Sequence, residues 1–189
     1  MTTVVIFHSV LGLRLVEQDA AERFRYAGFE VDLPDLYAGK RTESLREGFQ
    51  LMAQIGWPAI CQLASEAMHE LPESTILVGF SMGAGVIGSL WHQRPESKAV
   101  LLFHGLADIP RNVRPGLKVQ THVAEADPLV SAEQRALWVE SAQTAEVLVE
   151  DHSYSDAGHF FTDFNSSDYN SAASELAWRR ALHFLASFD

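Results

Sequence analysis

Gly79-Phe80-Ser81-Met82-Gly83 places a serine between two glycines near the middle of the chain, and the apolar segments on either side of it indicate the fold. The residues before it, 74–78, form a short apolar run rich in β-branched side chains, which predicts a buried strand. The residues after it, 84–91, are small and then apolar, which predicts a helix. A serine between a strand and a helix, with a glycine two positions to either side, fits the G-x-S-x-G pattern of a nucleophile turn. Such a turn projects the Ser81 hydroxyl above the sheet and aims the N–H of Met82 at negative charge forming nearby.

Strands and helices alternate along the rest of the chain. Apolar runs predict six strands, at 4–8, 29–33, 75–79, 98–103, 117–124 and 145–150. Helical spacing of apolar residues predicts helices at 14–27, 43–55, 59–71, 82–93, 131–142 and 168–188, with a long polar loop at 151–167. This alternation predicts an α/β fold, with a mostly parallel sheet of about six strands and helices on both faces. We expect a single domain over residues 1–189 without a lid domain, because this length suits one domain.

The composition argues against several classes of protein. A formal net charge of −11 disfavours nucleic acid and anionic membranes as partners. The single cysteine, Cys61, allows no internal disulfide, which is typical of a reducing cytosol. The N-terminal residues lack the basic segment and apolar run of a signal peptide, and no apolar run reaches the length of about 18 residues needed to span a membrane. We therefore expect a cytoplasmic protein, whose oligomeric state the composition does not predict.

Reactive groups are expected at the carboxyl ends of the parallel strands, which meet at one edge of the sheet. A serine hydroxyl needs a histidine base, and the histidine needs a carboxylate that holds its tautomer. The order serine, acid, histidine is met by Ser81, by Asp127 after the fifth strand, and by His159 in the long loop. Asp108 is the rival acid, but it lies in an irregular segment bounded by prolines, and Asp156 is very close in sequence to the histidine. The plainer alternative is an ordinary turn serine, a turn aspartate and a surface histidine.

An acyl-transfer site also needs two donors for the oxyanion of its intermediate. The backbone N–H of Met82 is the first donor. The second is expected in the loop after the first strand, where Val10 is the best candidate and Leu11 is next to it. The plainer alternative is that this loop only caps the helix that follows. The side chains expected to line the pocket for the acyl or alcohol group are His8, His104, Trp138 and Phe160.

Other kinds of site have little support in the sequence. His159 and Asp163 are four residues apart and His152 is nearby, but three metal ligands with supporting groups are not evident. The chain contains no H-E-x-x-H motif, paired cysteines or aspartate-rich loop. The glycines between 79 and 88 do not fit G-x-G-x-x-G, and no P-loop lysine follows them. We therefore expect neither a metal nor a cofactor.

Four stretches together carry a family resemblance. They are Leu33-Pro34-Asp35-Leu36-Tyr37, Gly79-Phe80-Ser81-Met82-Gly83-Ala84, Ala126-Asp127-Pro128-Leu129-Val130 and Gly158-His159-Phe160-Phe161. In these stretches, and along almost its whole length, the chain resembles the dienelactone hydrolase family of α/β-hydrolases. The resemblance implies a compact α/β-hydrolase fold, with Ser81, Asp127 and His159 as a catalytic triad. It also implies Val10 and Met82 as the oxyanion donors.

The chain departs from that family at three positions. Dienelactone hydrolases use a cysteine nucleophile where this chain has Ser81. In those enzymes a glutamate in the loop after the first strand helps control the cysteine, and Ser9 stands at the matching position. They also hold the substrate carboxylate with an arginine four residues after the catalytic histidine. Asp163 stands there in this chain and would repel a carboxylate.

Together these features predict a serine hydrolase that cleaves a small carboxylic ester, lactone or thioester through an acyl-enzyme on Ser81. One alternative keeps the triad but changes the acceptor, giving an acyltransferase or a peptidase for short peptides. A second alternative is a non-catalytic binding protein that retains the fold. The partner expected in the first case is a small-molecule ester or lactone, and the sequence does not choose among ester, lactone and thioester.

Overall fold

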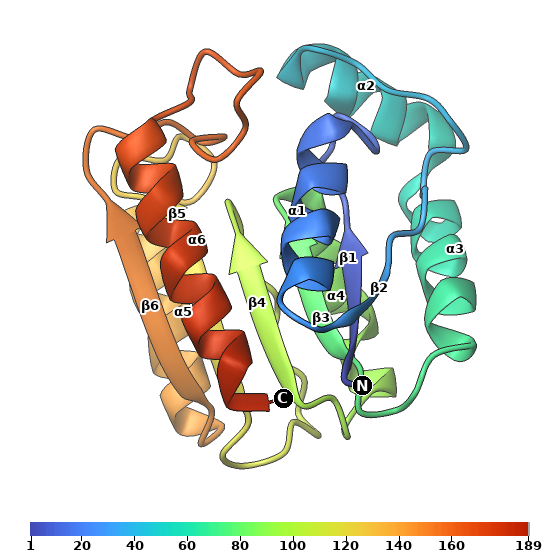
Figure 1. The fold of residues 1–189 in the computed structure, drawn as a ribbon, viewed down its shortest axis with the longest axis vertical. Coiled ribbons are helices and arrows are strands. Elements are labelled where there is room, and N and C mark those ends of the chain that lie inside the picture. Colours follow the sequence, from blue (N-terminus) through green and yellow to red (C-terminus); the bar gives the residue numbers. More distant parts are fainter. Residues whose placement is uncertain (189) are drawn as a thin grey trace.

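The computed structural model describes residues 1–188 and shows one sheet with helices on both of its faces (Figure 1). The sheet has six strands in the order β2-β1-β3-β4-β5-β6, and each neighbouring pair is parallel. The strands are β1 (Thr3–Phe7), β2 (Glu30–Asp32), β3 (Ile76–Phe80), β4 (Ala99–Phe103), β5 (Lys118–Ala124) and β6 (Leu148–Tyr154). The predicted α/β class, with a parallel sheet of six strands, is confirmed.

Two layers of helices enclose the sheet. The helices are α1 (Leu15–Tyr26), α2 (Leu45–Ile55), α3 (Trp57–His69), α4 (Met82–Leu90), α5 (Ala132–Thr144) and α6 (Ser171–Leu185), with short 3-10 turns η1 (Trp91–Gln93) and η2 (Ala186–Phe188). The apolar faces of α1 and α6 pack on one side of the sheet, in front of it in Figure 1. Those of α3, α4 and α5 pack on the other side, and α2 lies beside α3. No segment of residues 1–188 forms a separate lid domain over this three-layer arrangement.

The central strands are buried on both faces because they carry apolar side chains at consecutive positions. In β1, Val5 and Phe7 pack against the layer of α3, α4 and α5, whereas Val4 and Ile6 pack against the layer of α1 and α6. All four side chains are fully buried. Burial from two sides fixes the positions of the strand ends, and the candidate site is attached directly to those ends.

The chain reverses its direction of travel across the sheet beside β1. From β1 it passes to the edge strand β2, and it then returns to β3 on the opposite side of β1. The loops that leave β1 and β3 at their carboxyl ends therefore diverge and open a crevice, which is where such sheets bind ligands. Val10 follows β1 and Ser81 follows β3, so the two predicted parts of the site flank this crevice.

The sixth strand begins and ends later than the sequence predicts. It covers Leu148–Tyr154 rather than 145–150, and it pairs with β5 along its whole length. Residues 145–147 instead end α5 and form a turn, in which Glu146 has a φ of 58°. The polar residues 150–153 suit a strand here because β6 is at the edge of the sheet. The prediction was wrong because it assumed that a strand in this fold must be apolar throughout.

The closing helix begins at Ser171 rather than at 168. The side chain of Asn170 caps it by accepting a hydrogen bond from the N–H of Ala173 at 3.0 Å, so the helix cannot extend further back. The preceding residues, 155–169, form the loop that carries His159. Among the described residues, no helix combines the length and the apolar character needed to cross a membrane.

Candidate active site

Ser81 lies on the sharp turn between β3 and α4 in a strained backbone conformation. Its φ is 51° and its ψ is −106°, a combination that residues with a side chain rarely adopt. Two hydrogen bonds hold the turn: Ser81 N donates to the carbonyl of Phe103 at 2.8 Å, and Ala84 N donates to the carbonyl of Ser81 at 2.9 Å. The strand, turn and helix predicted around Ser81 are all present.

Both glycines of the motif are required because the backbone of α4 approaches the sheet closely. A Cβ atom on Gly79 would lie 2.6 Å from the backbone nitrogen of Ala84. A Cβ atom on Gly83 would overlap the backbone carbonyl of Phe7 in β1. Any side chain at either position would push the turn away from the sheet and misplace the Ser81 hydroxyl.

Ser81, His159 and Asp127 form a continuous chain of contacts at the carboxyl edge of the sheet. Ser81 Oγ is 2.9 Å from His159 Nε2. On the other side of the ring, His159 Nδ1 is 2.8 Å and 3.0 Å from the two carboxylate oxygens of Asp127. A carboxylate only accepts hydrogen bonds, so Nδ1 carries the proton, and Nε2 is left free to accept from the serine hydroxyl. This is the arrangement in which a histidine can act as a general base toward a serine.

The carboxylate of Asp127 is itself fixed and shielded from water. The side chain of Asp127 is 0% exposed and that of His159 is 2% exposed. The N–H of Leu129 donates to Asp127 Oδ1 at 2.8 Å, so the loop after β5 closes on the carboxylate. Neither rival acid takes this position: Asp108 lies beside a neighbouring cavity, and Asp156 is an exposed turn residue with a φ of 55°.

The loop that carries His159 is held at several points. Phe160 N donates to the carboxylate of Asp168 at 3.1 Å, and a Cβ on Gly158 would collide with that carboxyl group. Further along, Thr162 Oγ1 lies 2.7 Å from His104 Nε2. The ring of Phe160 packs edge-on against the imidazole of His159, with centroids 4.5 Å apart. His159 is therefore positioned by packing and hydrogen bonds although it lies on a long loop.

The two predicted oxyanion donors are backbone N–H groups of residues beside Ser81. Val10 and Met82 line the same cavity as Ser81 and His159. Met82 is the first residue of α4, so its N–H has no partner within the helix. Among the hydrogen bonds of residues 1–188 outside the helices and strands, none uses the N–H of Val10, whereas the N–H of Leu11 donates to Ser9 Oγ at 3.4 Å. Of the two loop residues considered, Val10 is thus the free donor, and its role as such stays a prediction.

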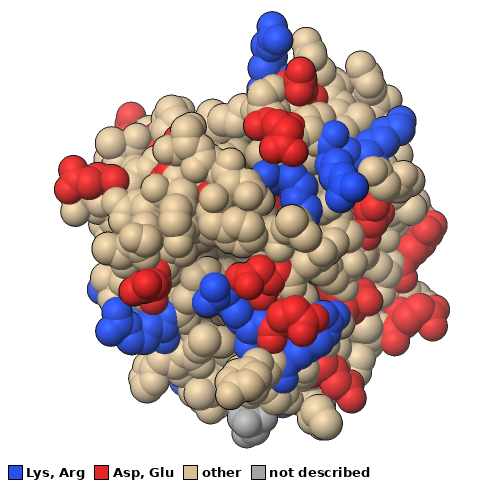
Figure 2. Space-filling model, turned by 45° about the horizontal axis from the view of Figure 1, so that its top comes forward, with Lys and Arg blue, Asp and Glu red and all other residues tan. Residues whose placement is uncertain are grey.

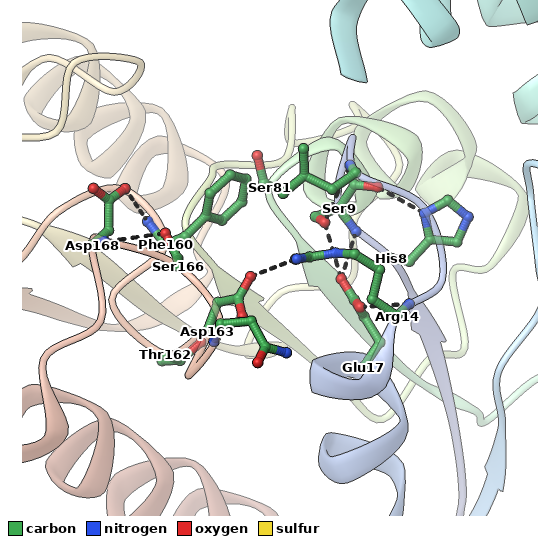
Figure 3. A network of polar contacts seen from close by, with 12 residues as sticks. His8, Ser9, Arg14, Glu17, Ser81, Phe160, Thr162, Asp163, Ser166 and Asp168 are labelled. Atoms are coloured by element: carbon green, nitrogen blue, oxygen red, sulfur yellow. Dashed lines mark hydrogen bonds and ion pairs between the residues drawn. The ribbon is translucent and has the colours of Figure 1, made fainter. Parts of the chain in front are cut away.

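A buried polar network behind the site links its two loops (Figure 3). Glu17 on α1 accepts hydrogen bonds from the N–H of Ser9 (3.3 Å), the hydroxyl of Ser9 (3.0 Å) and the N–H of Arg14 (3.0 Å). Figure 3 shows Arg14 reaching from the start of α1 to Asp163, where Nη2 and Oδ2 are 2.5 Å apart. The network therefore fixes the Val10 loop through Glu17 and ties it to the His159 loop through Asp163.

The network explains two of the departures from the family pattern. Ser9 replaces the family's glutamate, and Glu17 brings a carboxylate to it from the first turn of α1. Burial raises the pKa of Glu17, and the nearby Arg14 opposes that rise. Asp163 is 2% exposed and paired, and it does not line the cavity of Ser81, so it is not placed to repel a bound carboxylate. Glu17 was not predicted from the sequence, although its place three residues after Arg14 is the spacing of a helix cap.

The cavity beside Ser81 has a volume of about 300 Å³ and is only partly lined by the residues that the sequence predicts. His104 lines it. His8 is fully buried elsewhere, where its Nε2 accepts from the N–H of Leu36 at 3.0 Å. Trp138 lines a neighbouring cavity, and Phe160 supports His159 from behind rather than facing the cavity. The wall residues that the sequence analysis did not name include Phe49, Met52, Trp57, Leu106, Leu129 and Val130.

His104 contributes a neutral wall to this cavity. Burial lowers the pKa of its imidazole well below 6.5, and the neighbouring His159 and His122 lower it further. Its ring centroid is 5.9 Å from that of His159 and 4.9 Å from that of Phe161. Within residues 1–188, no group of three or more His, Cys, Asp and Glu side chains is arranged to hold a metal ion.

The parallel sheet with helices on both faces, and the serine, histidine and aspartate at its carboxyl edge, define an α/β-hydrolase. The sequence model of the Dienelactone hydrolase family matches residues 1–188, so the chain belongs to that family. It is thus a hydrolase of a family that acts on ester bonds. The comparison with curated proteins gave no match.

Solved structures with the same fold include a phosphotriesterase, an α/β-hydrolase and an esterase. A dienelactone hydrolase-like promiscuous phosphotriesterase from metagenomic libraries is 19% identical, with a TM-score of 0.82 over 99% of this chain and 86% of that chain. An α/β-hydrolase enzyme from a Medee basin deep-sea metagenome library is 15% identical, with a TM-score of 0.73 over 98% and 84% of the two chains. Esterase 2 of Thermogutta terrifontis, phosphorylated by paraoxon, is 18% identical, with a TM-score of 0.63 over 99% and 82%. At these identities the similarity shows the fold alone.

Proposed function

We propose that this chain is a serine esterase that cleaves a small carboxylic ester, lactone or thioester through an acyl-enzyme on Ser81. The observation that carries the proposal is the chain of contacts from Ser81 through His159 to Asp127, beside a cavity of about 300 Å³. Membership of the dienelactone hydrolase family supports chemistry on ester bonds. The absence of disulfides supports a reducing, cytoplasmic location as part of the same proposal, since Cys61 is the only cysteine.

In the first half-reaction, Ser81 Oγ attacks the carbonyl carbon of the substrate while its proton passes to His159 Nε2. Asp127 stabilises the imidazolium that results, through the hydrogen bond to Nδ1. The bond from the carbonyl carbon to the leaving oxygen or sulfur then breaks. The leaving group takes the proton from Nε2 and departs as an alcohol or thiol, and the acyl group remains on Ser81.

In the second half-reaction, a water molecule gives a proton to His159 Nε2 and attacks the acyl carbon. The bond between the acyl carbon and Ser81 Oγ breaks, and the proton returns to the serine. The balance is one ester and one water converted to one acid and one alcohol. In both halves we propose that the N–H groups of Val10 and Met82 stabilise the oxyanion. Losing one such donor lowers kcat by about 10²–10³-fold in sites of this kind.

Replacing Ser81 by alanine tests the nucleophile. We expect the wild type to turn over p-nitrophenyl acetate and Ser81→Ala to lose at least about 10³-fold of that activity. Ser89→Ala is a matched control, because Ser89 lies further along α4 with an exposed side chain and does not line the cavity. Turnover by Ser81→Ala equal to that of the wild type, with both proteins folded, would contradict the assignment.

An organophosphate separates the enzyme from a binding protein of the same fold. Because esterase 2 of Thermogutta terrifontis is phosphorylated by paraoxon, we propose that paraoxon also reacts with this chain. Ser81 Oγ would bond to phosphorus, p-nitrophenolate would leave, and the serine proton would pass to His159. One p-nitrophenol released per chain and a diethylphosphoryl adduct on Ser81 are expected. No adduct, together with no ester turnover, would favour the binding protein.

The acyltransferase and peptidase alternatives use the same triad. Both differ from the esterase in the acceptor or in the bond cleaved, which the geometry of Ser81, His159 and Asp127 does not distinguish. Product analysis in the presence of competing alcohols and amines, and assays on short peptides, would separate them. We expect the free acid to be the main product and expect no cleavage of amide bonds.

A further inference from the structure

The cavity beside Ser81 shares three of its lining residues with a second and larger cavity. The second cavity has a volume of about 460 Å³ and lies between the segment that follows β4 and helix α5. Leu106, Leu129 and Val130 line both cavities. The two cavities therefore adjoin each other at these three side chains. We call the two cavities together the long groove.

Six of the nine residues that line the second cavity are apolar, and the other three are Asp108, Gln134 and Ser141. Leu137 and Leu129 are among the most exposed large hydrophobic side chains of the described residues, with exposed fractions of 59% and 43%. Trp138 on α5 donates its only polar hydrogen to the carbonyl of Ala107 at 2.7 Å, so its ring offers apolar surface to the cavity. Exposed apolar side chains gathered beside a reactive site indicate a surface that a ligand covers.

The segment after β4, which forms one wall of the second cavity, is held in place by contacts with two helices. The hydrogen bond from Trp138 anchors the segment after β4 to α5. On the inner side, that segment approaches α4 so closely that a Cβ on Gly88 would lie 2.6 Å from the backbone nitrogen of Asp108. A preformed wall requires little ordering when a ligand enters, which favours binding by apolar contact alone.

Charges near the long groove limit the ligand further. Asp108 is the only ionisable side chain lining the second cavity, and no Lys or Arg among the described residues lines either part of the groove. Figure 2 shows acidic and basic side chains interspersed on the side of the molecule that is turned forward, with uncharged residues between them. An anionic ligand end would therefore meet a carboxylate and no cation, whereas a neutral apolar end meets Leu137 and Trp138.

We infer that the long groove binds a neutral apolar chain attached to the ester, so the substrate class is a medium-chain ester rather than an acetyl ester of a small alcohol. This inference rests on the proposed serine esterase function. A methylene-sized group occupies about 30 Å³, as does a water molecule in the liquid, so an eight-carbon chain fits a cavity of about 460 Å³. Each methylene that enters the groove is expected to raise kcat/KM by about two- to fourfold.

The test uses two series of esters, because the chain can belong to the acyl group or to the alcohol. The acyl series is p-nitrophenyl acetate, butyrate and octanoate, and the alcohol series is ethyl, butyl and octyl acetate. We expect kcat/KM to rise at least tenfold from the shortest to the longest member of one series. Equal or falling kcat/KM along both series, with the acetate still hydrolysed through Ser81, would refute the inference that the long groove binds the chain. The proposed esterase function would not be affected. No hydrolysis of any ester would overturn both.

Variants at two equally exposed leucines locate the effect. Leu137→Glu places a charge in the groove and should reduce the ratio of long-chain to short-chain kcat/KM at least tenfold. Leu148→Glu is the matched control, because Leu148 is 56% exposed on β6 and lines neither cavity. It should leave the ratio unchanged. An unchanged ratio in Leu137→Glu, or an equal fall in both variants, would refute the groove.

A terminal charge on the substrate probes Asp108. The p-nitrophenyl monoester of octanedioic acid carries a carboxylate where the octanoate has a methyl group. We expect it to react up to about fivefold more slowly than the octanoate, and Asp108→Asn to reduce that difference. Equal rates for the two esters in the wild type would contradict the placement of the chain end beside Asp108.

Discussion

Asp163→Asn tests the buried network that joins the two loops of the site. Asp163 Oδ2 and Arg14 Nη2 are 2.5 Å apart, and their side chains are 3% and 8% exposed. The substitution keeps the shape of the side chain and the acceptor for the N–H of Asn165, but it removes the negative charge opposite the guanidinium. Breaking a buried pair by removing one partner costs about 3–5 kcal/mol of unfolding free energy. We expect the lower end of that range, because the carboxylate of Glu17 remains near Arg14.

The matched control is the exposed pair of Arg23 and Asp19, whose atoms are 2.7 Å apart and whose side chains are 45% and 42% exposed. Asp19→Asn is the same chemical change, yet an exposed pair one helical turn apart contributes only about 0.3–0.5 kcal/mol. For a domain of this size, about 1 kcal/mol shifts the melting temperature by about 2–4 °C. Asp163→Asn should therefore lower it by about 6–12 °C, and Asp19→Asn by less than about 2 °C.

Urea unfolding and thermal melting of the two variants measure these losses. A second readout is kcat, measured well below the melting temperature, which should fall in Asp163→Asn because the His159 loop loses its tether to α1. It should not change in Asp19→Asn. Equal losses of stability in the two variants, or a loss below about 1 kcal/mol in Asp163→Asn, would refute the reasoning that burial makes this pair important.

Three further predictions follow from the site and the sheet. Gly83→Ala should abolish activity and destabilise the fold by several kcal/mol, because the new Cβ overlaps the backbone carbonyl of Phe7 in β1. Gly85→Ala is the control: its Cβ meets only the movable ring of Trp57, so this variant should fold and be close to wild type in stability. Asp127→Asn should lower kcat by about 10⁴-fold with little change in folding, and the same fall in Asp156→Asn would contradict the assignment. Burial lowers the pKa of His122 well below 6.5, so the unfolded chain binds a proton below pH 6.5 that the folded chain does not, and stability falls as the pH drops. Replacing His122 by phenylalanine should flatten that fall by up to about 1.4 kcal/mol per pH unit. Parallel pH profiles of unfolding free energy in the two proteins would show that His122 binds a proton equally in the folded and the unfolded chain, which would contradict the lowered pKa.

The sheet and the three central side chains could be predicted because each follows from a local constraint. The turn at Ser81 needs glycine on both sides, since the helix backbone touches Phe7 of β1, and that need is visible in the sequence. Asp127 and His159 follow β5 and β6 directly in chain order, so knowing the strands nearly fixes their place at one edge. The structure brings Ser81, Asp127 and His159 into contact at that edge.

The walls of the site could not be predicted in the same way, because they depend on packing between distant segments. His8 follows β1 directly, yet its ring turns away and accepts a hydrogen bond from Leu36. Phe49 and Met52 reach the cavity from α2, whose placement no sequence motif records. The network through Glu17 was missed for another reason: a glutamate in the first turn of a helix is normally a solvent-exposed cap, and nothing local shows that it is buried.

The backbone of Ser81 has a consequence for how this protein can change over generations. Holding a residue with a side chain at a φ of 51° and a ψ of −106° lowers the stability of the folded chain by about 1–3 kcal/mol relative to glycine. A Ser81→Gly change would thus relieve strain while removing the hydroxyl. Selection for heat resistance alone would therefore favour loss of the serine at this position. The serine is retained although it destabilises the turn, which is typical of residues that are selected for activity.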